Sequence, residues 1–103
     1  MFQFLRSLLD GNSTDYRALI NEGALIIDVR TQGEYQGGHI EGSLNIPLDQ
    51  IKKHIPELKK KNKTIIACCR SGARSGSATD LLNSAGLTAY NGGPWNRLQQ
   101  QIR

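Results

Sequence analysis

The chain alternates between short apolar runs and segments in which apolar residues recur every three or four positions. Four apolar runs have the length and composition of buried strands: residues 24–29, 43–48, 63–68 and 87–93. Four segments have helical spacing: residues 14–23, 48–61, 74–86 and 94–103. A short helical turn is expected within 31–38. Strands that alternate with helices predict an α/β fold, with a mainly parallel sheet of four or five strands and helices on both faces.

The ends of the predicted helices carry recognisable signals. Ser13 or Thr14 can cap the first helix, and Gly23 can end it. Gly86 follows the last apolar position of the helix over 74–86, and Pro94 stands where the final helix begins. These signals support the same order of elements as the apolar pattern.

The first residues differ from the rest of the chain. Phe2, Leu5, Leu8 and Leu9 share one helical face, so we expect an amphipathic segment over 1–12, followed by one domain over 13–103. Polar residues interrupt this segment and no small-residue cleavage site follows it, which argues against a signal peptide. No stretch approaches the ~20 apolar residues of a membrane span. We therefore expect no stable membrane insertion and a cytoplasmic location.

The chain is mildly basic. Its 13 Lys and Arg residues outnumber its 9 Asp and Glu residues, which gives a formal charge of +4 over 103 residues. The excess lies mainly in residues 51–63, a pattern typical of a solvated helix face. This run holds no aromatic side chain that could stack on bases, so a nucleic-acid partner is not expected.

The two cysteines are adjacent and lie next to unusual chemistry. Cys68 and Cys69 cannot build a disulfide framework or a complete zinc shell, so no metal is expected and the thiols are predicted to be free. They open the stretch "CCRSGARS" over 68–75, between a predicted strand and a predicted helix. In open α/β sheets, sites form at the carboxyl ends of strands. Cys68 is expected to continue the strand in the core, whereas Cys69 begins the loop.

The loop after Cys69 has the composition of an anion site. A tight loop with a glycine can turn its backbone N–H groups inward, and the helix that follows adds the positive end of its dipole. Arg70 and Arg74 strengthen the same field. Such surroundings stabilise a thiolate and lower its pKa, so Cys69 is the predicted nucleophile.

Other anion loops fit less well. The nucleotide-binding P-loop requires a lysine that "GARSGSAT" lacks. Cysteine phosphatases place five residues between their cysteine and arginine, whereas four residues separate Cys69 from Arg74. The smaller loop suits the outer sulfur of a persulfide better than a phosphoryl group.

Three stretches together resemble the single-domain rhodaneses, a family of sulfurtransferases. They are "LIIDVRTQGEYQGGHIEGSLNIPL" over 25–48, "CRSGARS" over 69–75 and "YNGGPW" over 90–95. The resemblance covers roughly residues 13–103 and implies a small α/β domain around a mainly parallel sheet. It also implies that Cys69 takes a sulfane sulfur from a donor such as thiosulfate and passes it to cyanide or a thiol. A protein that accepts this sulfur is a further partner that the resemblance allows.

The resemblance assigns roles to the residues around Cys69 and implies no metal or organic cofactor. The substrate-binding residues are expected to be Arg70, Ser71, Gly72, Ala73 and Arg74, with Arg74 alternatively bracing the loop. Asp28 and Arg30, at the end of a strand, are expected to support the loop. Ser75 can donate to the sulfur anion or cap the following helix. His39 is expected to have a structural role. Glu34 could cap a turn or pair with a base, and it is assigned no chemistry.

Three hypotheses for the function remain open at this point. The first is an enzyme of the thiosulfate sulfurtransferase type. The second is a persulfide-carrying or regulatory module that serves a specific protein partner. The third is a relative of the cysteine phosphatases or arsenate reductases, which the short loop disfavours.

Overall fold

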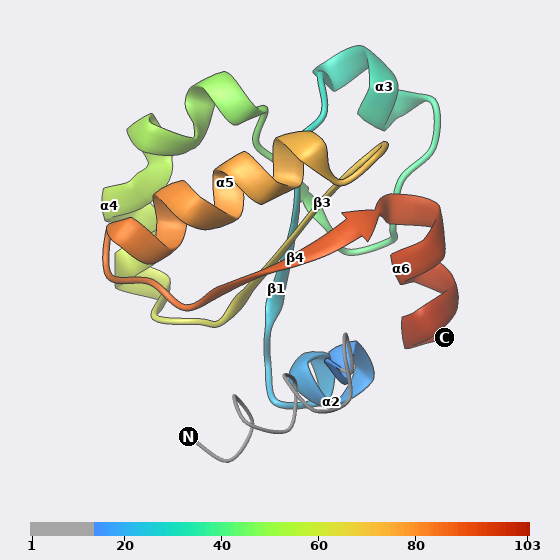
Figure 1. The fold of residues 1–103 in the computed structure, drawn as a ribbon, viewed down its shortest axis with the longest axis horizontal. Helices are drawn as coiled ribbons and strands as arrows, with labels where there is room; N and C mark the ends of the chain where they lie inside the picture. Colours follow the sequence, from blue (N-terminus) through green and yellow to red (C-terminus); the bar gives the residue numbers. More distant parts are fainter. Residues whose placement is uncertain (1–13) are drawn as a thin grey trace.

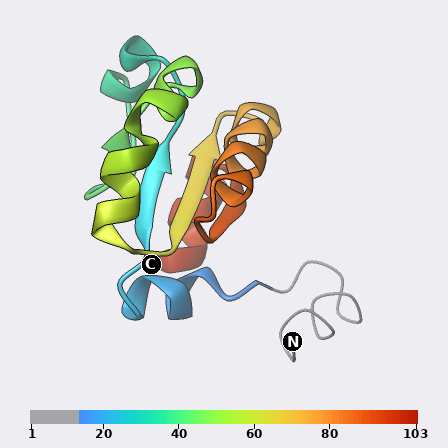
Figure 2. The ribbon, with the colours of Figure 1, turned by 90° about the vertical axis from the view of Figure 1, so that its left-hand side faces the viewer.

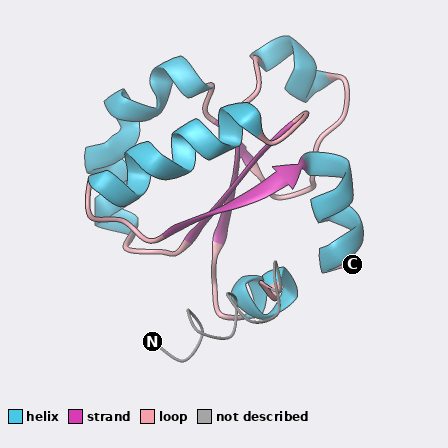
Figure 3. Ribbon diagram, in the orientation of Figure 1, coloured by secondary structure: helices cyan, strands magenta, loops and turns pink. Residues whose placement is uncertain are grey.

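The computed structural model describes residues 14–103, which fold around one four-stranded parallel sheet (Figures 1 and 3). The strands are β1 (Leu25–Asp28), β2 (Leu44–Asn45), β3 (Ile65–Cys69) and β4 (Ala89–Pro94), in the order β2-β1-β3-β4. The helices are α2 (Tyr16–Asn21), α3 (Gln32–Gln36), α4 (Ile51–Lys61), α5 (Ala73–Ser84) and α6 (Trp95–Ile102), with a 3₁₀ turn over Leu48–Gln50. The predicted amphipathic segment over 1–12 lies outside the described residues.

Helices cover both faces of the sheet, as Figure 2 shows. On one face, α4 and α5 bury Ile51, Leu58 and Leu82 against β1 and β3. On the other face, α2 and α6 bury Tyr16 and Leu98 against the same strands. The predicted α/β class with a parallel sheet is therefore confirmed, with four strands among the described residues. None of the helices within 14–103 has the length and apolar character that crossing a membrane requires.

Successive side chains of a strand point to opposite faces of the sheet, so the adjacent Cys68 and Cys69 face opposite sides. Both lie in β3 and both are fully buried. Cys68 packs into the cluster covered by α2 and α6, whereas Cys69 belongs to the cluster covered by α4 and α5. Only Cys69 therefore faces the helix that follows the loop.

Strand β4 places a polar residue beside this site and is irregular at the next position. Ala67 pairs with Asn91 but Cys68 pairs with Gly93, so Gly92 is the extra residue of a bulge. A Cβ on Gly92 would lie 2.9 Å from side-chain atoms of Ile66 and 3.1 Å from the carbonyl of Ala67, which only glycine avoids. Because Asn91 is in register with Ala67, its side chain is on the α5 side of the sheet.

The structure corrects three predicted boundaries. The run over 43–48 contains only a two-residue strand, because Pro47 has no N–H for a ladder and the chain then enters the 3₁₀ turn. Asp15 is the N-cap of α2 in place of Ser13 or Thr14, with its carboxylate accepting from the N–H of Ala18 at 3.1 Å. Cys69 is the last residue of β3 and does not begin the loop.

Candidate functional site

The candidate site lies at the carboxyl end of β3, where a short loop over 70–72 leads into α5. Strand β3 is central in the sheet, with β1 on one side and β4 on the other. The end of β1, the start of α3 and the carboxyl end of β4 therefore surround this loop. Within residues 14–103, no group of three His, Cys, Asp or Glu side chains is arranged to hold a metal ion.

Two backbone donors and the hydroxyl of Ser75 surround the sulfur of Cys69. The N–H of Gly72 lies 2.9 Å from Sγ, the N–H of Ser75 lies 3.4 Å away and the hydroxyl of Ser75 lies 3.2 Å away. Gly72 has a φ of +100°, a left-handed conformation that suits glycine. This conformation lets the chain turn back over the sulfur, which is 0% exposed.

These donors change the acidity of the thiol. Burial of Cys69 alone would raise its pKa, because a thiolate is poorly solvated in the protein interior. Hydrogen bonds from the Ser75 hydroxyl and from backbone N–H groups of the loop oppose this effect and outweigh it. The pKa of Cys69 is therefore lowered, as expected for a nucleophilic cysteine.

Cys68 shows the opposite behaviour on the other face of the sheet. Burial raises the pKa of its thiol to about 12, and the nearby Asp28 carboxylate raises it further. The thiol is fully buried and packed among Ile66 and Leu98. Of the two adjacent thiols, Cys69 is therefore the one whose pKa is lowered.

Asn91 ties the loop and the helix to β4. Its Nδ2 donates to the carbonyl of Gly72 at 3.1 Å, while its Oδ1 accepts from the N–H of Gly93 at 3.0 Å. These two backbone partners fix the orientation of the amide. The same Oδ1 accepts from the hydroxyl of Ser75 at 2.6 Å, so one side chain holds both the Gly72 and the Ser75 donors of the Cys69 sulfur.

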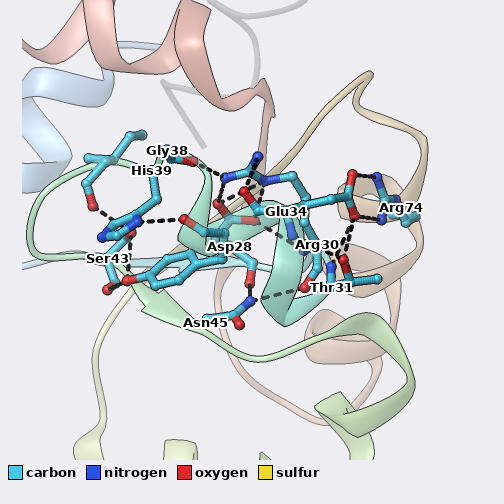
Figure 4. A network of polar contacts seen from close by, with 11 residues as sticks. Asp28, Arg30, Thr31, Glu34, Gly38, His39, Ser43, Asn45 and Arg74 are labelled. Carbon is cyan, nitrogen blue, oxygen red and sulfur yellow. Dashed lines mark hydrogen bonds and ion pairs between the residues drawn. The ribbon is translucent and has the colours of Figure 1, made fainter.

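Arg74 does not stand free at the end of the loop. Its two terminal nitrogens lie 2.7 Å and 3.0 Å from the two carboxylate oxygens of Glu34 on α3 (Figure 4). Glu34 also forms a capping box with Thr31, in which each side chain bonds the backbone N–H of the other. Hydrogen bonds from Arg74, and then from Thr31, lower the pKa of Glu34 to about 2.

Asp28 and Arg30 form a second, buried ion pair (Figure 4). Arg30 places Nη2 2.7 Å from Asp28, and its Nε also donates to that carboxylate. The guanidinium further donates to the carbonyls of Glu34 and Gly38. The guanidinium also lies 4.8 Å from the ring centroid of Trp95. Among the described residues, this pair therefore holds the α3 turn and α6, with no hydrogen bond to residues 70–74.

This arrangement agrees with the comparison to known families. A family model described as "Rhodanese-like domain" matches residues 12–94. The chain belongs to the rhodanese family. A solved structure titled "rhodanese with anions from E. coli" has 34% identity and a TM-score of 0.65, and the match covers 72% of this chain and 89% of that one.

Two curated relatives of this rhodanese domain carry informative names. The thiosulfate sulfurtransferase PspE of Escherichia coli (strain K12) is 40% identical over 63 residues, which are 60% of this chain and 61% of that protein. The putative sulfur carrier protein YrkF of Bacillus subtilis (strain 168) is 38% identical over 67 residues, 65% of this chain and 36% of that protein. The chain thus spans less than two thirds of either relative.

The rhodanese domain brings most of the predicted site residues together. Gly72 and Ser75 contact the sulfur of Cys69, whereas Arg70, Ser71 and Ala73 are exposed at the rim of the loop. Arg74 contacts Glu34, which corresponds to the bracing role considered for it. His39 has the structural role expected, because its ring stacks on Tyr35 at 3.7 Å and Nδ1 lies 2.7 Å from the Tyr35 carbonyl.

Sequence reasoning identified one of these residues only in part and missed another. Glu34 was expected to cap a turn or pair with a base, and it does both, but nothing in its spacing to Thr31 indicates that its partner is 40 positions away. Asn91 lies within the quoted stretch over 90–95, yet its contact with Ser75 depends on the pairing of β4 with β3, which sets it next to Ala67. No pattern near Asn91 in the sequence indicates that contact.

Proposed function

We propose that this protein is a sulfurtransferase in which Cys69 carries a sulfane sulfur from an anionic donor to a nucleophilic acceptor. The observation that carries the proposal is the placement of two backbone N–H donors and the Ser75 hydroxyl around the Cys69 sulfur. Donors of this kind stabilise a thiolate before the reaction and a persulfide anion after it. The transferase character of the family supports the same reaction class.

The proposed reaction has two steps. The Cys69 thiolate attacks the outer sulfur of thiosulfate, a new S–S bond forms, and the bond to the sulfonate group breaks as sulfite leaves with its electron pair. Cyanide or a thiolate then attacks the outer sulfur of the Cys69 persulfide. Thiocyanate or a new persulfide leaves, and the Cys69 thiolate returns. Both steps conserve charge and electrons, so neither needs an external oxidant or reductant.

The backbone of the loop would serve both steps. The N–H groups of Gly72 and Ser75 already point at the sulfur, and the exposed Arg70 at the rim would attract an anionic donor. Because Cys69 is fully buried, the donor can reach it only if the loop or the side chain moves. We therefore expect the rate of loading to depend on the size of the donor.

Initial-rate kinetics with thiosulfate and cyanide test this proposal. Parallel lines in double-reciprocal plots are expected, because sulfite leaves before cyanide enters. Cys69→Ser should abolish thiocyanate formation, and Cys68→Ser is the matched control because that thiol lies in the core on the opposite face of the sheet. Thiocyanate production that survives in Cys69→Ser would contradict the proposed role.

A persulfide carrier that serves a protein partner is the second candidate. The burial of Cys69 favours it, because an enclosed sulfur is protected from small thiols in solution. The similarity to a putative sulfur carrier points the same way. Stoichiometric loading of Cys69 with slow release to cyanide would favour the carrier, whereas many turnovers per Cys69 would favour the enzyme.

A further inference from the structure

The loop carries less positive charge than its two arginines imply. Arg74 is held by both oxygens of Glu34, and with a pKa of about 2 this carboxylate stays ionised at neutral pH. Arg30 is likewise paired with the buried Asp28. Among the described residues, Arg70 is the arginine of the loop that has no ion-pair partner.

The charges around the loop come from several elements. Arg74 belongs to α5 and Glu34 to α3, and Asp28 and Arg30 lie at the end of β1. From α6, the guanidinium of Arg97 lies beside Gly93, 2.6 Å from the position that a Cβ there would take. Strand β4 contributes the neutral amide of Asn91 next to Ser75. Among the described residues, Glu34 is therefore the carboxylate that pairs with Arg74, the arginine in the first turn of α5.

We propose that Glu34 is a specificity-determining residue that lowers the preference of this site for donors with two negative charges. The inference rests on the proposed sulfur transfer and names the class of donor. The site is expected to favour sulfur donors with one negative charge, or none, relative to a dianion such as thiosulfate. The physical reason is Coulombic, because the interaction of a donor with a fixed charge scales with the charge of that donor. Neutralising the charge of Arg74 therefore removes twice as much electrostatic attraction from a dianion as from a monoanion.

The substitution Glu34→Gln removes this charge and keeps the fold. Glutamine can still take the third position of a capping box, so the bond to Thr31 and the start of α3 are retained. Arg74 then carries an unopposed charge beside the loop. Side chains of this ion pair are about one-third exposed, 36% for Arg74 and 31% for Glu34, so solvent can reach the freed guanidinium.

The first measurement compares thiosulfate, a dianion, with methanethiosulfonate, a monoanion that delivers sulfur from the same kind of S–S bond. If Glu34→Gln raises kcat/KM for thiosulfate by about tenfold, the value for methanethiosulfonate should rise by the square root, about threefold. The ratio of kcat/KM for thiosulfate to kcat/KM for methanethiosulfonate should therefore rise about threefold. This gain should shrink as salt is added, since exposed charges are screened over about 10 Å at 0.1 M.

Two control variants separate charge from structure. Thr31→Ala breaks the capping box but leaves Glu34 and Arg74 paired, so the donor ratio should stay as in the wild type. Glu22→Gln makes the same change in net charge at the end of α2, on the opposite side of the molecule from α3 (Figure 1). A shift of the ratio in either control equal to that in Glu34→Gln would overturn the inference.

A second measurement does not depend on sulfur transfer. The rate of Cys69 alkylation by iodoacetate, an anion, is divided by the rate with iodoacetamide, a neutral analogue of similar size. Glu34→Gln should raise this quotient by about two- to threefold, because the two reagents differ by one charge. An unchanged quotient overturns the inference. A raised quotient in a protein that accepts sulfur from neither donor supports the charge effect and refutes the proposed function instead.

Discussion

The hydroxyl of Ser75 makes a contribution to the acidity of Cys69 that can be measured. It lies 3.2 Å from Sγ and is the largest single cause that lowers the pKa of that thiol. The perturbation is Ser75→Ala, which removes the hydroxyl and keeps the backbone N–H that also faces the sulfur. Burial, which raises the pKa, is then opposed by backbone donors alone.

The size of the effect follows from the two partners of the hydroxyl. A hydrogen bond to a charged group contributes about 1.5–3 kcal/mol. In the thiol state the same proton is held by Oδ1 of Asn91 at 2.6 Å, so the net gain for the thiolate lies at the low end of that range. Since one pKa unit equals about 1.4 kcal/mol, Ser75→Ala should raise the pKa of Cys69 by about one unit.

The assay is the rate of alkylation of Cys69 by iodoacetamide as a function of pH. The thiolate is the reactive form, so the rate rises with pH and levels off above the pKa. If the pKa rises by one unit, the alkylation rate at pH values below the pKa falls by up to about tenfold. At pH values above the pKa the two rates become similar. Cys68 does not interfere, because its pKa is raised to about 12 and its thiol is buried.

Ser77→Ala is the matched control for this prediction. Ser77 lies on the exposed side of the same helix, and its hydroxyl contacts only the carbonyl of Ala73 at 3.5 Å. Its removal should leave the profile of Cys69 unchanged. A pKa in Ser75→Ala that equals or falls below the wild-type value, with the fold intact by circular dichroism, would refute the reasoning.

Three further predictions concern the frame of the site. Gly92→Ala should lower the free energy of unfolding by about 1–3 kcal/mol in urea titrations, because its Cβ would lie 2.9 Å from core side chains. Gly33→Ala, where nothing lies within 4 Å, should change stability by less than about 1 kcal/mol. Glu34 should titrate near pH 2 by carboxyl ¹³C NMR, and Arg74→Gln should raise that pKa toward the ordinary range; no rise would mean that Arg74 is not its main cause. Asn91→Ala should speed hydrogen exchange of the backbone amides in the loop. Unchanged exchange protection would show that the loop keeps its conformation without the Asn91 hydrogen bond.

The elements and the place of Cys69 next to the loop could be predicted from the sequence because their signals are local. The buried strand over 65–69 is a continuous apolar run, and Cys69 stands at its carboxyl end before a glycine-containing loop. Position along the strand then decides which cysteine faces the loop and α5, since neighbouring residues face opposite sides of a sheet. Because the final strand residue is Cys69 itself, the boundary moves by one position, and the role proposed for Cys69 stays the same.

The partners of the site could not be predicted because they come from distant parts of the chain. Arg74 and Glu34 meet only because α3 and α5 begin beside each other above the sheet. Asn91 reaches Ser75 only because β4 pairs with β3, which places Asn91 next to Ala67 on the face of the sheet that α5 covers. Such contacts depend on tertiary packing, which no residue spacing near Arg74 or Asn91 encodes.

The most direct test of the account is the intact mass of the protein before and after thiosulfate is added. The account predicts a gain of about 32 Da, one sulfur atom, that cyanide removes and that is absent from Cys69→Ser but present in Cys68→Ser. A gain that persists in Cys69→Ser would contradict the assignment of Cys69. No gain in the wild type with either thiosulfate or methanethiosulfonate would contradict the proposed sulfur transfer itself.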